Sequence, residues 1–84
     1  MKTIPNELTK NFADDKTRKE IIEKFTDYKQ AFFGKNEDGE DVEIHIAESG
    51  IILKTYQNNG WLRVNYYDEN GYAEDEVFNG KWDR

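Results

Sequence analysis

Few residues in this chain could perform catalysis. His45 is the only histidine, and cysteine is absent. The strand pattern described below pairs His45 with Lys54, and a neighbouring cation does not suit a general base. Ser49 belongs to a turn signal, so no nucleophile accompanies the histidine. We therefore expect no catalysis from His45, and we rank a pH-sensing role only little higher.

Metal and cofactor sites are equally poorly supported. Placing Gly39 or Gly71 at the glycine position of an EF-hand loop leaves the first and last ligand positions without carboxylates. Glu74 and Glu76 share a face of a predicted strand, but no opposing acid or base is evident. The lack of cysteine excludes zinc ribbons and disulfides. The sequence therefore predicts a non-enzymatic protein with no metal and no cofactor.

Charge is distributed unevenly along the 84 residues. The net charge is -6, yet residues 1–35 sum to +2 and residues 36–84 sum to -8. This balance argues against direct binding of nucleic acid, which requires clustered Lys and Arg. The chain shows no apolar run of transmembrane length and no signal-peptide core at its start. We therefore expect a cytoplasmic protein with no membrane partner.

The first third of the sequence has the pattern of helices. Thr17 and Glu20 fit a capping box. Apolar residues then recur three and four positions apart, which predicts an amphipathic helix over about 16–28. A shorter helix at about 6–13 is a second expectation, because Pro5 stands near its start.

From residue 28 onward, turn signals recur at regular intervals. Five dipeptides are spaced 11, 10, 11 and 9 residues apart: Asp38-Gly39, Ser49-Gly50, Asn59-Gly60, Asn70-Gly71 and Asn79-Gly80. Most are typical of tight hairpins, in which both central residues need positive φ. The segments between them are rich in Val, Ile, Tyr and Phe with period-two alternation. This pattern predicts a five-stranded antiparallel meander.

The register of the meander follows from the assumed loop lengths. Two-residue loops at the first three turns pair Phe33 with Ile44 and Leu53 with Tyr66. A four-residue loop at the fourth turn pairs Leu62 with Val77. These loops place eleven residues on one face, which we expect to be the core: Ala31, Phe33, Val42, Ile44, Ile46, Ile51, Leu53, Leu62, Val64, Tyr66 and Val77.

These elements define a single α+β domain over residues 1–84, with 1–28 helical and 29–84 a β-meander. One or two N-terminal helices are expected to pack on the core face. Asp75 falls on this face, which suggests that the last strand is an edge. Curling of the sheet toward a partial barrel is an alternative, since small twisted sheets often close.

The opposite face is predicted to be rich in rings, which is unusual for a solvated sheet. It would carry Phe32, His45, Ile52, Lys54, Tyr56, Trp61, Arg63, Tyr67, Tyr72 and Phe78, edged by Asp41, Glu43, Glu74 and Glu76. Three interpretations compete. The rings are core under a curled sheet or under residues 1–13, they form a protein-binding face, or they form a ligand platform. No converging polar groups favour the third.

The acidic clusters indicate the kind of partner. They lie at predicted hairpin tips and edges, where they would create a negative field that matches a basic surface. The chain is similar in size, acidity and lack of catalytic residues to small inhibitors of bacterial defence nucleases, of the anti-restriction and anti-CRISPR type. That resemblance, which is one of composition rather than motif, implies a nucleic-acid mimic that occupies the basic groove of a nuclease or another nucleic-acid-binding protein.

The functional expectation is therefore a non-enzymatic protein-binding module. The alternative is a structural or assembly subunit of a phage or mobile element that forms homo-oligomers through an aromatic sheet face. The residues expected to contact the partner are Glu43, Tyr56, Trp61, Arg63, Tyr67, Asp68, Glu69, Tyr72, Glu74, Asp75 and Glu76.

Overall fold

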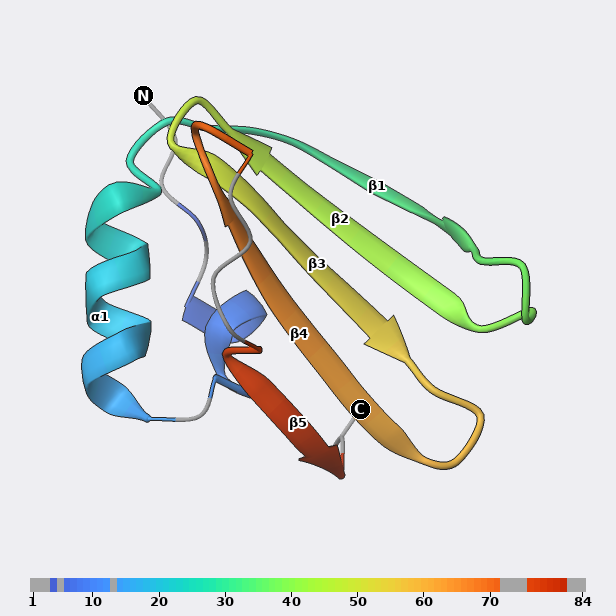
Figure 1. Cartoon of the computed structure of the whole chain (residues 1–84). Coiled ribbons are helices and arrows are strands. Elements are labelled where there is room, and N and C mark those ends of the chain that lie inside the picture. The colour runs from blue at the N-terminus through green and yellow to red at the C-terminus, as the bar shows by residue number, and fades with distance from the viewer. Residues whose placement is uncertain (1–3, 5, 13, 72–75, 82–84) are drawn as a thin grey trace.

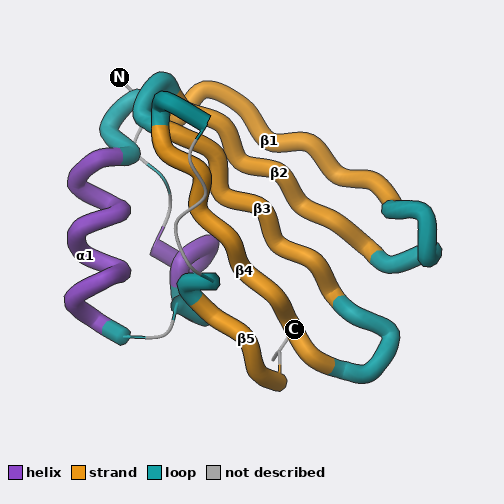
Figure 2. Tube along the Cα trace, viewed as in Figure 1, coloured by secondary structure: helices purple, strands orange, loops and turns teal. Residues whose placement is uncertain are grey.

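The fold is one antiparallel sheet with helical segments on one side of it (Figure 1). A computed structural model describes residues 4, 6–12, 14–71 and 76–81. These residues form a 3-10 helix, an α-helix and five strands: η1 (Asn6–Thr9), α1 (Asp15–Lys24), β1 (Tyr28–Lys35), β2 (Asp41–Ala47), β3 (Gly50–Tyr56), β4 (Trp61–Asp68) and β5 (Phe78–Lys81). The strands follow chain order across the sheet, as Figure 2 shows, so the predicted α+β meander is confirmed.

Helix α1 is shorter than predicted, and its cap differs. Asp14, rather than Thr17, is the N-cap, and its side chain accepts hydrogen bonds from the Thr17 backbone N–H (2.7 Å) and from the Thr17 hydroxyl (3.1 Å). The carboxylate competes successfully because it can bond two donors of the first turn at once. These bonds hold the pKa of Asp14 below its usual value. The helix ends at Lys24, and Phe25 is its fully buried C-cap.

The second predicted helix, at 6–13, is a single 3-10 turn. Thr9 at its end is fully buried, and the hydroxyl of Thr9 accepts a hydrogen bond from Arg18 Nε of α1 (3.1 Å). Nearby, Ile4 and Phe12 belong to the hydrophobic core together with Ile21 and Phe25. Both helical segments therefore cover the same side of the sheet (Figure 1).

The predicted register differs from the structure at all four hairpins, and at the first and third the cause is a loop of three residues instead of two. In the first, Asn36 N–H bonds Glu40 O (3.0 Å) and Gly39 N–H bonds Asn36 O (3.1 Å). In the third, Gln57 and Gly60 make the matching pair of bonds, at 2.8 and 3.0 Å. Each loop ends on a glycine with positive φ, while no other residue type in the described chain has positive φ. These are type I turns with a bulge, not the mirror-image turns that a two-residue loop requires.

A shift of one residue turns the next strand over, so β2 and β3 are reversed relative to the prediction. Phe33 pairs with Glu43 instead of Ile44, and Leu53 pairs with Asn65 instead of Tyr66. The β2–β3 register differs from the prediction by two residues, because the two-residue loop is Glu48-Ser49 rather than Ser49-Gly50, and a shift of two preserves the shared face. The one-residue shift in the β3–β4 hairpin then returns β4 to its predicted orientation. The predicted core placement of Leu62, Val64 and Tyr66 is therefore confirmed.

The helix-covered face therefore differs from the predicted core. It includes buried Ala47 and Ile52 and the polar residues His45 and Lys54. Five residues predicted to be core point away from the helices instead: Val42, Ile44, Ile46, Ile51 and Leu53.

Strand β5 begins later than predicted. Leu62 pairs with Gly80 rather than Val77, a shift of three residues that also reverses the strand. Phe78, predicted on the face opposite the core, therefore pairs with Val64 on the covered face and packs against the core. Val77 is buried as expected, but it precedes the strand. The prediction for Asp75 lies outside the described residues.

The sheet is not closed into a barrel, because β1 and β5 are its two edges. Within the described ranges, neither helical segment has the length and apolar character that crossing a bilayer requires.

Candidate functional site

The sheet surface opposite the helices is the molecule's main candidate site. We call it the open face. Along β1–β5 it consists of Gln30, Phe32, Gly34, Val42, Ile44, Ile46, Ile51, Leu53, Thr55, Trp61, Arg63, Asn65, Tyr67, Asn79 and Lys81. Phe32, Ile51 and Trp61 are 47%, 37% and 43% exposed. An antiparallel sheet that leaves one face to water normally carries polar residues there, whereas this one carries aliphatic and aromatic side chains.

Cross-strand pairing arranges the open face in rows. One row runs Phe32, Ile44, Leu53, Asn65 across β1–β4. A second places Ile46 and Ile51 side by side, next to Tyr67. The aliphatic residues thus occupy β2 and β3, and the rings lie on the flanking strands β1 and β4.

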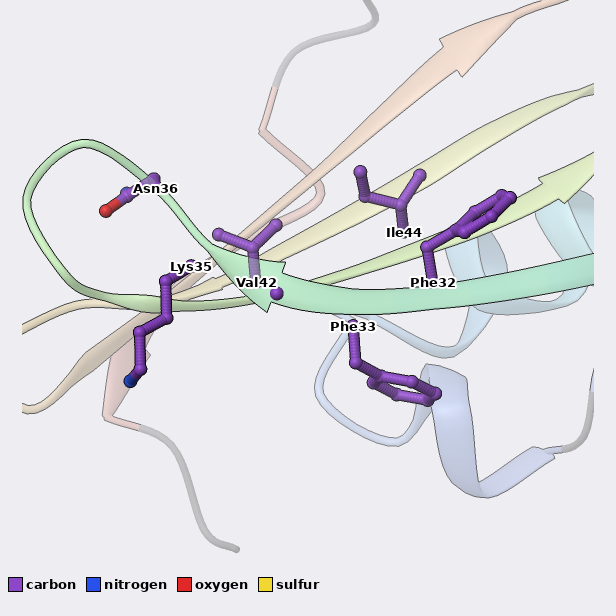
Figure 3. Close-up of a pocket in the computed structure, with 7 residues that line it drawn as sticks. Phe32, Phe33, Lys35, Asn36, Val42 and Ile44 are labelled. Carbon is purple, nitrogen blue, oxygen red and sulfur yellow. The ribbon is translucent and has the colours of Figure 1, made fainter.

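A shallow hollow of about 240 Å³ indents the β1 side of this face. Its lining includes Phe32, Phe33, Val42 and Ile44 (Figure 3). Phe32, Val42 and Ile44 point to one side of the sheet, whereas Phe33 points to the side of the helices. Phe33 is 73% exposed there, because the edge of the sheet extends beyond the helical cover. The hollow therefore joins the open face to the edge of β1.

The strands present no carboxylate on the open face. Asp41, Glu43 and Asp68 all fall on the other side of their strands. Of the two cations on the face, Arg63 is paired through its Nε with Glu76 Oε1 at 3.0 Å. The centre of the open face is therefore uncharged.

The predicted acidic cluster at the first hairpin lies at the far end of the molecule from α1 (Figure 1). Glu37 and Asp38 are exposed at its tip. Glu40 joins this tip to the neighbouring hairpin, because its Oε1 accepts from Asn36 Nδ2 (2.9 Å) and its Oε2 from the Asn58 backbone N–H (2.8 Å). These two bonds lower the pKa of Glu40. The tips therefore form one connected acidic end.

A polar network lies on the covered face. Glu43 Oε1 accepts a hydrogen bond from the Tyr56 hydroxyl (2.9 Å), and Glu43 Oε2 lies 3.3 Å from His45 Nε2. His45 Nδ1 lies 3.4 Å from the Tyr28 hydroxyl, so both ring nitrogens have polar neighbours. Burial lowers the pKa of His45, which favours the neutral ring even though Glu43 opposes that shift. His45 is 1% exposed, so this ring is poorly placed to meet a substrate.

Lys54 is buried beside this network and forms no ion pair with any described residue. It is 2% exposed, and no carboxylate oxygen of the described residues lies within 4 Å of its Nζ. Burial lowers the pKa of Lys54, and Lys10 adds to this effect while Glu43 opposes it. The amine is thus an internal charge rather than a contact for a partner.

Because β2 and β3 are reversed relative to the prediction, the residues predicted to contact a partner are divided between the two faces. Glu43 and Tyr56 lie on the covered face, while Trp61, Arg63 and Tyr67 lie on the open face. At the ends of the sheet, Asp68 is half-buried on the covered side, Glu69 is exposed in a turn and Glu76 is exposed beside Arg63. Tyr72, Glu74 and Asp75 lie outside the described residues. Sequence reasoning missed the aliphatic centre of the open face, which a three-residue loop assumption would have found.

Comparison of the chain with models of known protein families, with curated proteins and with solved structures finds no match. The site is therefore interpreted from its own geometry.

Proposed function

We propose that this chain is a non-enzymatic protein-binding module and that the open face is its contact surface. The supporting observation is a sheet face with an aliphatic centre and exposed rings that no described element covers. Large contiguous apolar patches usually mark interfaces, and Trp, Tyr and Arg, which this face also carries, are the residue types most frequent among hot spots. The buried histidine and the uncharged centre of the open face give no support to catalysis.

The test compares two substitutions that each add one negative charge. Leu53→Glu alters the centre of the open face, whereas Asn70→Glu alters an exposed turn. Wild type and both variants are purified, and circular dichroism confirms that each is folded. Each chain then serves as bait to capture a partner protein at 0.1 M and at 0.5 M salt. We expect wild type and Asn70→Glu to retain the partner at both salt concentrations and Leu53→Glu to lose it. Equal retention by all three chains would contradict the proposal.

The acidic hairpin end favours a second candidate, a nucleic-acid mimic. Exposed Glu37 and Asp38 stand on a tip that Glu40 fastens to the adjacent hairpin, so the charges have a fixed position. Binding of this kind would fall steeply with salt. It would also be lost in a Glu37→Lys and Asp38→Lys double variant and kept in Leu53→Glu, the reverse of the pattern expected for the open face.

A further inference from the structure

We propose that the occupant of the open face is a second copy of this chain. The two sheets would pack face to face about a two-fold axis that runs along the strands between β2 and β3. This inference rests on the proposed function and names its partner. Three independent features of the open face carry it: its charge, its extent and its row pattern.

The first feature is charge. Each copy has a net charge of -6, so self-association requires an interface that keeps acids apart. The open face meets this requirement, because the Asp and Glu residues of its strands fall on the other face and Arg63 is neutralised by Glu76. A basic partner, by contrast, would find no opposing charge there. Like charges of two copies would lie on the outer surfaces and hairpin ends of the assembly.

The second feature is extent. The axis superimposes β1–β4 of the two copies and leaves β5 outside, so four strands about 4.8 Å apart and seven residues of about 3.3 Å each give a shared face of roughly 19 by 23 Å, or about 440 Å². Two copies would bury about 880 Å², which is below the roughly 1,200 Å² of a standard stable interface and in the range of weak, transient ones. The shared face is therefore large enough for a weak dimer that forms at high protein concentration.

The third feature is the row pattern. An axis along the strands maps β2 of one copy onto β3 of the other, and β1 onto β4. Each row then meets itself in reverse, so Ile44 lies over Leu53 and Ile46 over Ile51. Phe32 of one copy lies over Asn65 of the other, between the rows of Arg63 and Tyr67. Aliphatic residues therefore meet aliphatic residues, and the ring reaches a site where a cation and another ring are available.

The experiment measures molar mass by light scattering coupled to size-exclusion chromatography. The protein concentration is varied from about 10 µM to about 1 mM, the range in which weak interfaces of this kind associate. Wild type and Asn70→Glu are expected to approach twice the 10.0 kDa of one chain. Leu53→Glu brings carboxylates together at the axis in both copies, so its dimer dissociation constant should rise about 100-fold or more. Circular dichroism of Leu53→Glu confirms that a lost dimer is not a lost fold.

Two results would overturn the inference. One is a wild type that stays at 10.0 kDa throughout. The other is a Leu53→Glu variant that dimerises like wild type, which would assign the contact to another surface such as the β1 edge. A monomeric wild type that still retains a different protein through Leu53 would remove only this inference and leave the proposed function intact. A wild type that neither self-associates nor retains a protein would remove both.

Discussion

Gly50 is the position where one added methyl group should damage the fold most. A Cβ built there collides with the backbone carbonyl oxygen of Tyr67 and lies 2.8 Å from the Tyr66 hydroxyl. That hydroxyl donates a hydrogen bond to Ser49 O (2.9 Å), and Tyr66 is 1% exposed, so neither neighbour can move away easily. Gly50→Ala must therefore push β3 and β4 apart where the sheet meets the core.

The expected loss combines two effects. Overpacking a well-filled site costs about 1–3 kcal/mol. Loss of the Tyr66 hydrogen bond adds about 1 kcal/mol. We expect Gly50→Ala to lower the free energy of unfolding by about 2–4 kcal/mol, which at about 4–8 °C per kcal/mol lowers Tm by roughly 10 °C or more.

Gly34→Ala is the matched control, because an added Cβ there has no heavy atom within 4 Å. Gly34 also lies in a strand, and alanine restricts the unfolded chain, so this variant should gain about 0.5 kcal/mol. Urea and thermal denaturation of both variants give the two numbers. If Gly50→Ala lost no more stability than Gly34→Ala, the close packing inferred around Tyr66 would be refuted.

Two further predictions concern the polar network of the covered face. The pKa of His45 is lowered by burial, so the unfolded chain binds its proton more readily; stability should therefore fall as pH drops below about 6.5, toward the lower folded value. Urea titrations at pH 7.5 and 5.5 should show a smaller drop in His45→Gln than in wild type, and equal drops would argue against this histidine as the source. Lys54 is buried with its pKa lowered, so removal of its charge in Lys54→Met should raise the free energy of unfolding at pH 7 by about 1 kcal/mol. A loss of stability in the same assay would show that the ammonium ion has a favourable partner.

The sequence predicted the architecture well, because turn dipeptides and alternating strands are local signals. The five-stranded meander and the helical cover follow from these signals. Loop length is not a local signal of the same quality. Asp38-Gly39 and Asn59-Gly60 suit a two-residue loop in which both residues have positive φ, yet they also suit a type I turn in which only the glycine does.

The face assignment depended on that choice. Val42, Ile44 and Leu53 are more apolar than His45 and Lys54, so hydrophobic pattern alone favours the former for the core. Tertiary contacts decide otherwise, because the residues that reach the helices include Ile52 and the rings of Tyr56 and Tyr66. The candidate site was defined by cross-strand rows, so it depends on the same loop lengths. The prediction therefore places Tyr56 and Arg63 on one face, whereas they lie on opposite faces.

The two three-residue loops have a consequence for how this sequence can change over time. The first loop turns β2 and β3 over relative to β1, compared with a two-residue loop. The second loop turns β4 over relative to β3, so β1 and β4 keep their orientation toward the helices. Deletion of one residue from either loop alone would put half of the sheet out of phase with the helices. Deletion from both loops would return a consistent sheet with β2 and β3 turned over, with Ile44 and Leu53 inside and His45 and Lys54 in water. Gly39 and Gly60 thus stand at the boundary between two topologically identical folds with exchanged interiors, and a lineage could pass from one to the other only by changing both hairpins together.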